Sequence, residues 1–414
     1  MTSTTSAQPP TSTSTPTSTA TSTATSAAGS PPAAGLRADV LVVGGGIAGA
    51  SLAAELAEQS GGSASVVLVE AQGALATQTS ARSARQMQPS YGPPPVQALT
   101  AASLPLVALA EEATGRRVLR ERPLLWVDAV GGATGREAFA ALLAQVPSLR
   151  TSGASEALQR FPLLRPEAVH AVAVDDDARE VAVPVLVEHH VERARRGGVR
   201  VLVGAPVTSA VRRAGGWDVT AGEHRISAGT LVDAAGPWAD VVAGVAGVRR
   251  RGLVPKRRTV VVADDERAVG EHWPMVADVA ETLYARPGRD VDGDLLASPA
   301  EAVPSEPCDA QPVPADVDAL LAGLDAVLDL GAVRVRRSWT GLRTGPADGL
   351  PVVGWDDGQQ GFFWLAGQGG FGIQTSSALA RAAAAAVLGQ SHGLGAAVDD
   401  AVAAFSPSRP SLAG

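Results

Sequence analysis

Residues 38–70 constrain the fold more than any other stretch of the chain. Val40–Val43 form a short apolar run, typical of a buried parallel strand, and Gly44 follows directly. The segment "AGASLAAELAEQ" then has helical spacing, and a second apolar run, "SVVLVE", ends in Glu70. A strand, a glycine-rich turn, a helix and a second strand that ends in an acid together predict a βαβ dinucleotide-binding unit.

The glycines of this turn have the spacing G-x-G-x-x-G. Gly44 would permit the tight turn, Gly46 would let the backbone approach a pyrophosphate, and Gly49 would allow close packing of the helix. Glu70 would accept hydrogen bonds from the adenosine ribose and would repel the extra phosphate of NADP. No second complete fingerprint follows, which counts against an enzyme that binds NAD and FAD in separate units. The predicted contacts of the turn are Gly44, Gly46, Ile47, Ala48 and Gly49.

The remaining composition argues against several classes of protein. A net charge of -8 argues against a nucleic-acid-binding protein, which would usually show a basic face. Cys308 is the one cysteine, no His, Cys and Asp residues have metal-ligand spacing, and no window predicts a membrane span. Residues 1–38 contain no acidic or aromatic residue and no apolar signal core, so we expect a disordered tail. We expect a cytoplasmic protein and leave membrane association open.

Five motifs together resemble one family. The chain is similar to the FAD-dependent D-amino acid oxidase superfamily, and within it to D-amino acid dehydrogenases of the D-arginine dehydrogenase type. The resemblance covers essentially residues 38–410. The motifs are "GGGIAG", "TSARSA" at 79–84, "TLVDAAGPWAD" at 230–240, "WTGLRTGPADGLPVVG" at 339–354 and "GFFWLAGQGGFGIQTSSALA" at 361–380.

This resemblance implies an α/β fold in which a Rossmann-type FAD-binding domain is interleaved with a sheet-based substrate domain. Residues 338–343 lack the cysteine that sarcosine-oxidase relatives carry there, so noncovalent FAD is implied. We expect the FAD-binding domain to comprise residues 39–110, 166–245 and 336–405. The substrate domain would then comprise residues 111–165 and 246–335.

The resemblance also implies which residues contact the flavin. The loop from Gly369 to Thr375 would cover the isoalloxazine, and the following helix would direct its N-terminal dipole at the anion that forms on reduction. Val207 matches the position whose backbone meets the adenine. The further implied contacts are Ala81, Arg82, Ser83, Ala84, Ala235, Gly236, Trp238, Gly341, Gly369, Gly370, Phe371, Gly372, Ile373, Gln374 and Thr375.

Oxidation of an amino acid requires a grip on its carboxylate, and the planar fork of arginine matches a carboxylate. Arg258 and Arg343 stand at family-matching positions. Tyr284 resembles the tyrosine that bonds the substrate carboxylate, and Tyr91 resembles the one on a mobile loop that closes the pocket. Gln86, Gln374 and these four residues form the predicted catalytic set.

The chain also departs from the D-arginine type. Gln86 stands where that type has a histidine, so any acid–base role is lost there. Arg85 replaces a small residue, and Trp126 and Val127 stand near the point where a glutamate would meet the guanidinium of the substrate. These departures favour a broader or more apolar D-amino acid as substrate.

The resulting prediction is hydride transfer from the Cα of a D-amino acid to flavin N5, followed by hydrolysis of the imine to a 2-oxo acid and ammonia. The electron acceptor, a quinone or oxygen, stays open. One alternative is an oxidase of sarcosine or another secondary amine from the same superfamily. The other is a flavin-binding protein whose chemistry has decayed. His189 and His190 are expected on the surface.

Overall fold

The computed structural model describes residues 35–265, 269–288 and 294–412. Its first sheet has the strand order β10-β11-β12-β1-β2-β9, and β19 extends it by pairing with β12 and β18. β1 is parallel to both of its neighbours, β12 and β2, as a Rossmann-type unit requires. The strands are β1 Leu36–Val43, β2 Val66–Val69, β9 Arg200–Leu202, β10 Val207–Arg213, β11 Gly216–Ala221, β12 His224–Asp233, β18 Val352–Trp355 and β19 Phe362–Ala366.

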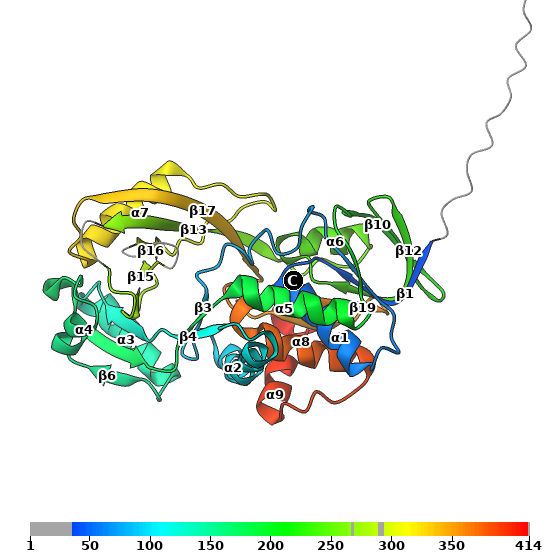
Figure 1. The fold of residues 1–414 in the computed structure, drawn as a ribbon, viewed down its shortest axis with the longest axis horizontal. Helices are drawn as coiled ribbons and strands as arrows, with labels where there is room; N and C mark the ends of the chain where they lie inside the picture. The colour runs from blue at the N-terminus through cyan, green and yellow to red at the C-terminus, as the bar shows by residue number, and fades with distance from the viewer. Residues whose placement is uncertain (1–34, 266–268, 289–293, 413–414) are drawn as a thin grey trace, which may run out of the picture. The chain divides into compact units, whose positions relative to one another are not determined.

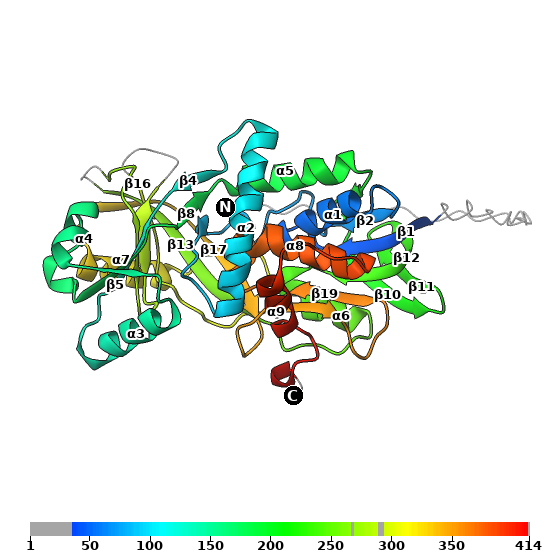
Figure 2. The same cartoon turned by 90° about the horizontal axis from the view of Figure 1, so that it is seen from below.

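Both faces of this sheet are covered. Val40 and Val42 pack into a core formed with the helices on one face, whereas Leu41 and Val43 pack into a second core that includes α6. This alternation explains why the run at 40–43 is apolar throughout. Figures 1 and 2 show α1, α5 and α8 on one face of the sheet. The helices are α1 Ile47–Gln59, α2 Pro94–Thr114, α5 Val183–Arg196, α6 Ala239–Val245, α8 Gly372–Leu388 and α9 Ala396–Ala404.

The second sheet has the order β17-β13-β16-β15-β14-β5-β7-β6. It buries one core that includes residues of α4 and α7 and another that includes Tyr284 and Trp126. Its strands are β5 Leu124–Asp128, β6 Arg150–Ser152, β7 Ala171–Asp175, β13 Val254–Asp265, β14 Met275–Asp278, β15 Tyr284–Pro287, β16 Asp294–Ser298 and β17 Val333–Gly345. Its helices are α3 Gly132–Gln145, α4 Ala154–Arg160 and α7 Pro314–Val327.

A small third sheet lies in the order β3-β8-β4. It consists of β3 Gln86–Met87, β8 Arg179–Val181 and β4 Leu119–Glu121, and three short 3-10 helices complete the described structure at Pro166–Ala168, Gly236–Trp238 and Pro410–Leu412. β3 begins two residues after the "TSARSA" loop, and the N–H of Val181 at the end of β8 donates to the carbonyl of Arg85 at 2.9 Å, which ties the end of the loop to this sheet.

Three details differ from the expected segment limits. Residues 36–38 of the predicted tail belong to β1, and residues 1–34 lie outside the described residues. β7, at 171–175, pairs with β5 in the second sheet although residues from 166 onwards were expected in the FAD-binding domain. β17 pairs with β13 from Val333 to Gly345, so the second sheet extends past residue 336. The sequence does not mark these pairings, because the sheet that a strand joins depends on partners far away along the chain.

The prediction that His189 and His190 lie on the surface is wrong. Their exposed fractions are 8% and 3%, because α5 packs its histidine-bearing side against the protein. On α5, Arg193 also bonds Glu55 of α1 through Nη2 and Oε1 at 2.7 Å, which joins the two helices.

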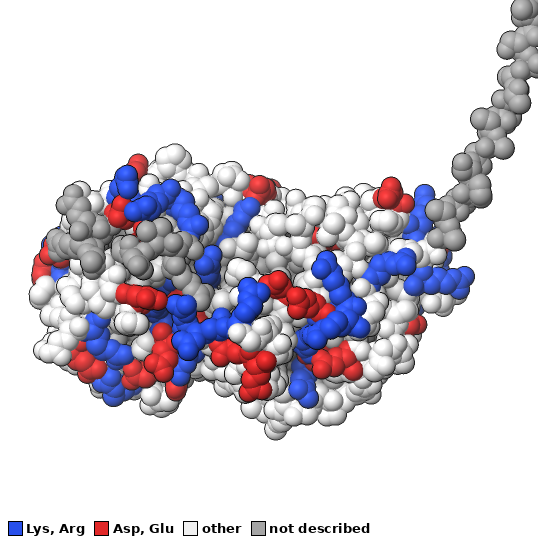
Figure 3. Space-filling view, in the orientation of Figure 1, with Lys and Arg blue, Asp and Glu red and all other residues white. Residues whose placement is uncertain are grey.

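The surface drawn in Figure 3 mixes positive and negative side chains instead of gathering charge of one sign. Within the described ranges, no helix is both long and apolar enough to cross a membrane. The same residues contain no cluster of three or more His, Cys, Asp or Glu side chains that could hold a metal ion.

Candidate active site

The first cavity lies at the carboxyl ends of β1 and β2 and has a volume of about 340 Å³. Two glycines fix the backbone of the turn beside it, of which Gly44 lines the cavity and Gly49 does not. A Cβ on Gly49 would lie 1.9 Å from the carbonyl oxygen of Gly44, and one on Gly44 would lie 2.4 Å from that of Ala234. Gly44 also has a φ of 107°, which strongly favours glycine. The sequence-predicted residues that line this cavity are Gly44, Gly46, Ile47, Ala48, Glu70, Val207, Ala235, Gly236, Trp238, Gly369 and Gly372.

Glu70 lies at the end of β2 and organises the turn. Its Oε2 accepts a hydrogen bond from the backbone N–H of Gly45 at 2.7 Å, and its Oε1 accepts one from Gln72 at 2.8 Å. Each carboxylate oxygen keeps further acceptor capacity, so Glu70 can also receive ribose hydroxyls. A backbone cradle that a Cβ would fill, with an acid at its edge, fits an adenine dinucleotide.

A second cavity, of about 120 Å³, continues from the first. The two share Ile47, Thr79, Ser80, Gly369 and Gly372, so they form one continuous lined path from the nucleotide turn to the second sheet. The sequence-predicted residues lining the second cavity are Ile47, Arg82, Ser83, Ala84, Gln86, Tyr91, Arg258, Tyr284, Gly341, Arg343, Gly369, Gly370, Gly372, Ile373 and Gln374. A dinucleotide in the first cavity would reach the second with its flavin end.

A few predicted flavin contacts lie elsewhere. Ala81 and Thr375 line neither cavity, and Thr375 is fully buried with its hydroxyl bonded to the carbonyl of Phe371 at 2.9 Å. Phe371 lines a third, neighbouring cavity. Arg82 contributes to the second cavity, but its guanidinium binds Asp309 and donates to the carbonyl of Thr340 at 3.0 Å.

Arg258 and Arg343 come from one pair of antiparallel strands. Arg258 lies opposite Gly341 and Lys256 lies opposite Arg343, so the two arginines are diagonal neighbours on the same face. Arg258 is only 9% exposed, and its Nε is buried without a hydrogen-bond partner. Burial and the neighbouring Arg343 lower the pKa of Arg258. An anion bound between the two guanidinium groups would therefore stabilise both of them.

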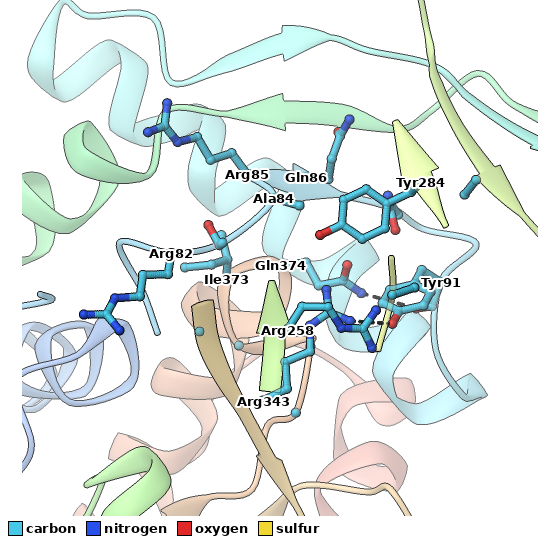
Figure 4. A pocket seen from close by; sticks show the side chains of 18 of the residues that line it. Arg82, Ala84, Arg85, Gln86, Tyr91, Arg258, Tyr284, Arg343, Ile373 and Gln374 are labelled. Carbon is cyan, nitrogen blue, oxygen red and sulfur yellow. Dashed lines mark hydrogen bonds between the residues drawn. The ribbon is translucent and has the colours of Figure 1, made fainter. Parts of the chain in front are cut away.

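Tyr284 and Gln86 also line the second cavity, and in Figure 4 the carboxamide of Gln86 points away from Arg258 and Arg343. The hydroxyl of Tyr284 and both amide atoms of Gln86 are buried, and none has a hydrogen-bond partner among the described residues. Buried polar groups are ordinarily satisfied, so these atoms indicate a polar ligand.

Tyr91 and Gln374 are bonded to the protein itself. The phenol oxygen of Tyr91 accepts a hydrogen bond from Nη1 of Arg343 at 3.2 Å. The amide nitrogen of Gln374 donates to Oγ1 of Thr100 at 2.9 Å and to the carbonyl of Tyr91 at 3.3 Å. Gln374 therefore links the start of α8 to α2 and to the Tyr91 loop, as the dashed lines in Figure 4 show in part.

A third cavity, of about 660 Å³, adjoins the second and shares Tyr91, Trp126, Arg258, Glu281 and Arg343 with it. Exposed residues of α3, Ala141 and Gln145, line its other side. This arrangement provides a path from solvent to the two arginines.

The structure adds Met275, Ala277, Leu283 and Glu281 to the residues named from the sequence. Met275, Ala277 and Leu283 join Trp126, which the sequence had placed near the substrate, in an apolar wall of the second cavity, and Glu281 stands where the second and third cavities meet. Glu281 has a φ of 55°, a conformation rare for residues other than glycine. No sequence signal marks these residues, because apolar strand residues look alike whether they face a core or a cavity.

The fold and these connected cavities are those of a flavin-dependent oxidoreductase. Residues 39–386 match the family described as "DAO: FAD dependent oxidoreductase", and the chain belongs to this family. The family depends on FAD, so the predicted cofactor and the predicted fold class are both confirmed.

Relatives and solved structures agree on the fold. Mitochondrial dimethylglycine dehydrogenase of Rattus norvegicus is 26% identical over 374 residues, which is 83% of this chain and 42% of that protein. The chain thus spans less than half the length of this relative. Glycine oxidase from Geobacillus kaustophilus superposes with a TM-score of 0.77 at 21% identity, over 90% of this chain and 99% of that one. L-proline dehydrogenase from P. horikoshii superposes with a TM-score of 0.76 at 18% identity, over 91% of this chain and 98% of that one.

Proposed function

We propose that the protein oxidises D-amino acids to 2-oxo acids and ammonia, with FAD as hydride acceptor. The observation that carries this proposal is Arg258, a buried guanidinium with no hydrogen-bond or ion-pair partner among the described residues, next to Arg343. A buried cation of this kind needs an anion, and the planar fork of arginine favours a carboxylate. The unpartnered hydroxyl of Tyr284 is well suited to bond the same carboxylate.

In this proposal the protein contributes mainly orientation. Arg258 and Arg343 hold the carboxylate, and the carboxamide oxygen of Gln86 accepts a hydrogen bond from the amine. Bound FAD supplies the hydride acceptor, and its predicted contacts are those that line the first two cavities. No histidine lines the second cavity in the described part of the chain, so the amine would lose its proton to solvent before the reaction. Water then hydrolyses the released imine.

The apolar wall of Trp126, Met275 and Leu283 supports a substrate with an apolar side chain over D-arginine. A D-arginine dehydrogenase would need a carboxylate for the substrate guanidinium. Two acidic residues line the same cavity: the carboxylate of Asp278 already accepts hydrogen bonds from the N–H of Ala129 at 3.2 Å and from the hydroxyl of Thr282, whereas Glu281 would be the group able to meet a basic side chain. The side chain of the substrate would lie along this wall while Arg258 and Arg343 hold its other end.

A second candidate is the oxidation of an N-methylated glycine. The sequence similarity to dimethylglycine dehydrogenase supports it, and the same two arginines would hold the carboxylate.

Anaerobic bleaching of the flavin absorbance distinguishes these candidates. The purified protein is mixed with single D-amino acids, their L-enantiomers, sarcosine and dimethylglycine. Fast bleaching by D-enantiomers alone is the expected result, with apolar side chains ahead of D-arginine. Bleaching by sarcosine or dimethylglycine alone would establish the second candidate. Absence of bleaching by all of them, with FAD bound, would leave a flavoprotein without amino acid oxidation. Reoxidation by oxygen or by a quinone analogue then identifies the acceptor.

A further inference from the structure

A buried charged cluster lies directly behind the second cavity. Arg122, Glu180 and Arg286 form it, with side chains that are 4%, 1% and 1% exposed. Nη2 of Arg122 lies 2.9 Å from Oε2 of Glu180, and Nη1 of Arg286 lies 3.6 Å from Oε1 of the same carboxylate. Among the described residues, these three side chains carry two positive charges and one negative charge.

The cluster contacts the elements that carry the candidate site. Nε of Arg286 donates to the carbonyl of Ala84 at 3.1 Å, and Ala84 lines the second cavity. Arg286 lies two residues after Tyr284 on β15, so both side chains leave the same face of that strand. Glu180 lies opposite Gln86 in the β3–β8 pair. Ala84, Tyr284 and Gln86 are therefore each connected to the cluster, through a hydrogen bond, a shared strand and a strand pair respectively.

A charge excess of this kind is costly to bury. Burial is the largest influence on Arg286 and lowers its pKa to about 10. Buried ion pairs are often no more stable than well-packed apolar residues of the same volume, and an unbalanced cation is worse. Backbone carbonyls compensate in part, because Arg286 donates to that of Pro287 at 2.7 Å and Arg122 to that of Glu271 at 2.6 Å. Fold stability alone therefore does not account for the second arginine.

We propose that Arg286 is a positioning residue for the redox site. It holds Ala84 against the flavin end of the cavity and, with Arg122 and Glu180, places one net positive charge behind it. This charge favours the electrons that the cofactor gains on reduction, because a field inside a low-dielectric region is weakly screened. The inference rests on the proposed binding of FAD in these cavities and does not depend on which amine is the substrate.

The test is the two-electron reduction potential of the bound FAD, measured with reference dyes and a chemical reductant in the absence of substrate. Arg286→Met removes the charge, and we expect the equilibrium to shift at least about tenfold toward oxidised flavin, which is about 30 mV for this couple. Arg286→Lys keeps the positive charge but loses the planar guanidinium, and we expect the reduction potential of its FAD to stay near that of the parent protein. Arg122→Met also removes one positive charge and leaves the balanced pair of Arg286 and Glu180, so its potential should fall too.

Arg251 offers a matched control. It is also fully buried, but its Nη2 lies 2.5 Å from Asp356 and 2.6 Å from Asp357, and it lines neither of the first two cavities. We expect Arg251→Met to lower the melting temperature and leave the potential unchanged. An unchanged potential in Arg286→Met would overturn the inference, as would an equal fall in Arg251→Met. If Arg286→Met does not retain FAD, the reduction potential of Arg122→Met is compared with that of the parent instead, and an unchanged value there would overturn the inference. If the parent protein binds FAD but does not oxidise D-amino acids, and the shifts in potential are still observed, only the proposed function is overturned.

Discussion

The phenol of Tyr91 accepts a hydrogen bond from the guanidinium of Arg343, with 3.2 Å between the oxygen and Nη1. Because the oxygen is the acceptor here, the hydroxyl hydrogen stays free to be donated. The ring also lies 5.2 Å from that of Phe371, between centroids, which restrains it from the side of the glycine loop. Tyr91 is thus prepared to donate to a carboxylate held on Arg343.

Replacement of Tyr91 by Phe tests this arrangement. We expect KM for the substrate to rise about tenfold with kcat within about twofold, because a hydrogen bond to a charged group contributes about 1.5–3 kcal/mol. Steady-state kinetics measure both constants. Trp355→Phe is the control, since Trp355 lines none of the three cavities. A lower KM in Tyr91→Phe would show that the phenol obstructs the arginine.

Arg258→Met should lower the activity of the protein without lowering its thermal stability. Removing a buried cation that has no counter-ion among the described residues should leave the melting temperature equal or higher. The same change should reduce kcat/KM by about 10²–10³-fold, because truncating one partner of a buried charge pair costs about 2–5 kcal/mol. The kcat/KM of Arg258→Lys should lie between those of the parent and Arg258→Met, since lysine keeps the positive charge but lacks the planar guanidinium. Differential scanning fluorimetry and kinetics give the two readouts, and a large loss of stability in Arg258→Met would contradict a ligand-binding role.

Gly49→Ala should impair FAD binding. Its Cβ would lie 1.9 Å from the carbonyl oxygen of Gly44, so α1 must move away from the turn, at a cost of about 1–3 kcal/mol. We expect less FAD after gel filtration, read from the flavin absorbance, and a lower melting temperature. Gly73→Ala is the matched control, because a Cβ there meets nothing within 4 Å. Equal FAD content in both variants would refute the importance of this contact.

His190 should make the protein less stable in mild acid. Burial lowers its pKa to about 3 from the ordinary value of 6.5, with smaller contributions from Arg193 and His189. Between these values the unfolded chain binds a proton that the folded protein does not. The free energy of unfolding therefore falls as pH decreases from about 6.5 toward 3, by up to about 1.4 kcal/mol per pH unit.

Urea denaturation between pH 7 and pH 5 measures this dependence. His190→Gln should flatten it by up to one bound proton, whereas His272→Gln, at an exposed histidine, should not change it. A parallel slope in His190→Gln and the parent would exclude the buried histidine as its source.

The pH dependence of kcat/KM should follow the substrate and not the protein. Since no histidine lines the second cavity in the described ranges, the rising limb should reflect loss of a proton from the amine of the substrate. Substrates whose amines differ in pKa should shift the midpoint by the same difference. A midpoint that stays fixed across substrates would indicate a titrating group on the protein.

Sequence predicted the nucleotide half of the molecule well. The contacts of Gly44 and Gly49 are local, and a chain that must bring a strand end against a helix start has few residue choices there. The surroundings of Arg258 are different, because its isolation depends on which of many apolar strands pack around it. His190 shows the same limit: its helix has a charged pattern, and only its packing reveals the buried side. Glu281 was missed because it lies at the tip of a hairpin whose register depends on distant strands.

The β13–β17 pair carries Arg258 and Arg343, the two arginines proposed to hold the substrate carboxylate, on a single ribbon whose register runs without a shift from Val254 to Val262. Tyr91 and Tyr284 come from other segments, the loop before α2 and β15. Any hinge motion that opens the cavity would therefore alter the spacing between arginine and tyrosine and leave the spacing between the two arginines fixed. If the two arginines hold a carboxylate as proposed, their mutual spacing is set by the strand pair, and only the tyrosines can move relative to it.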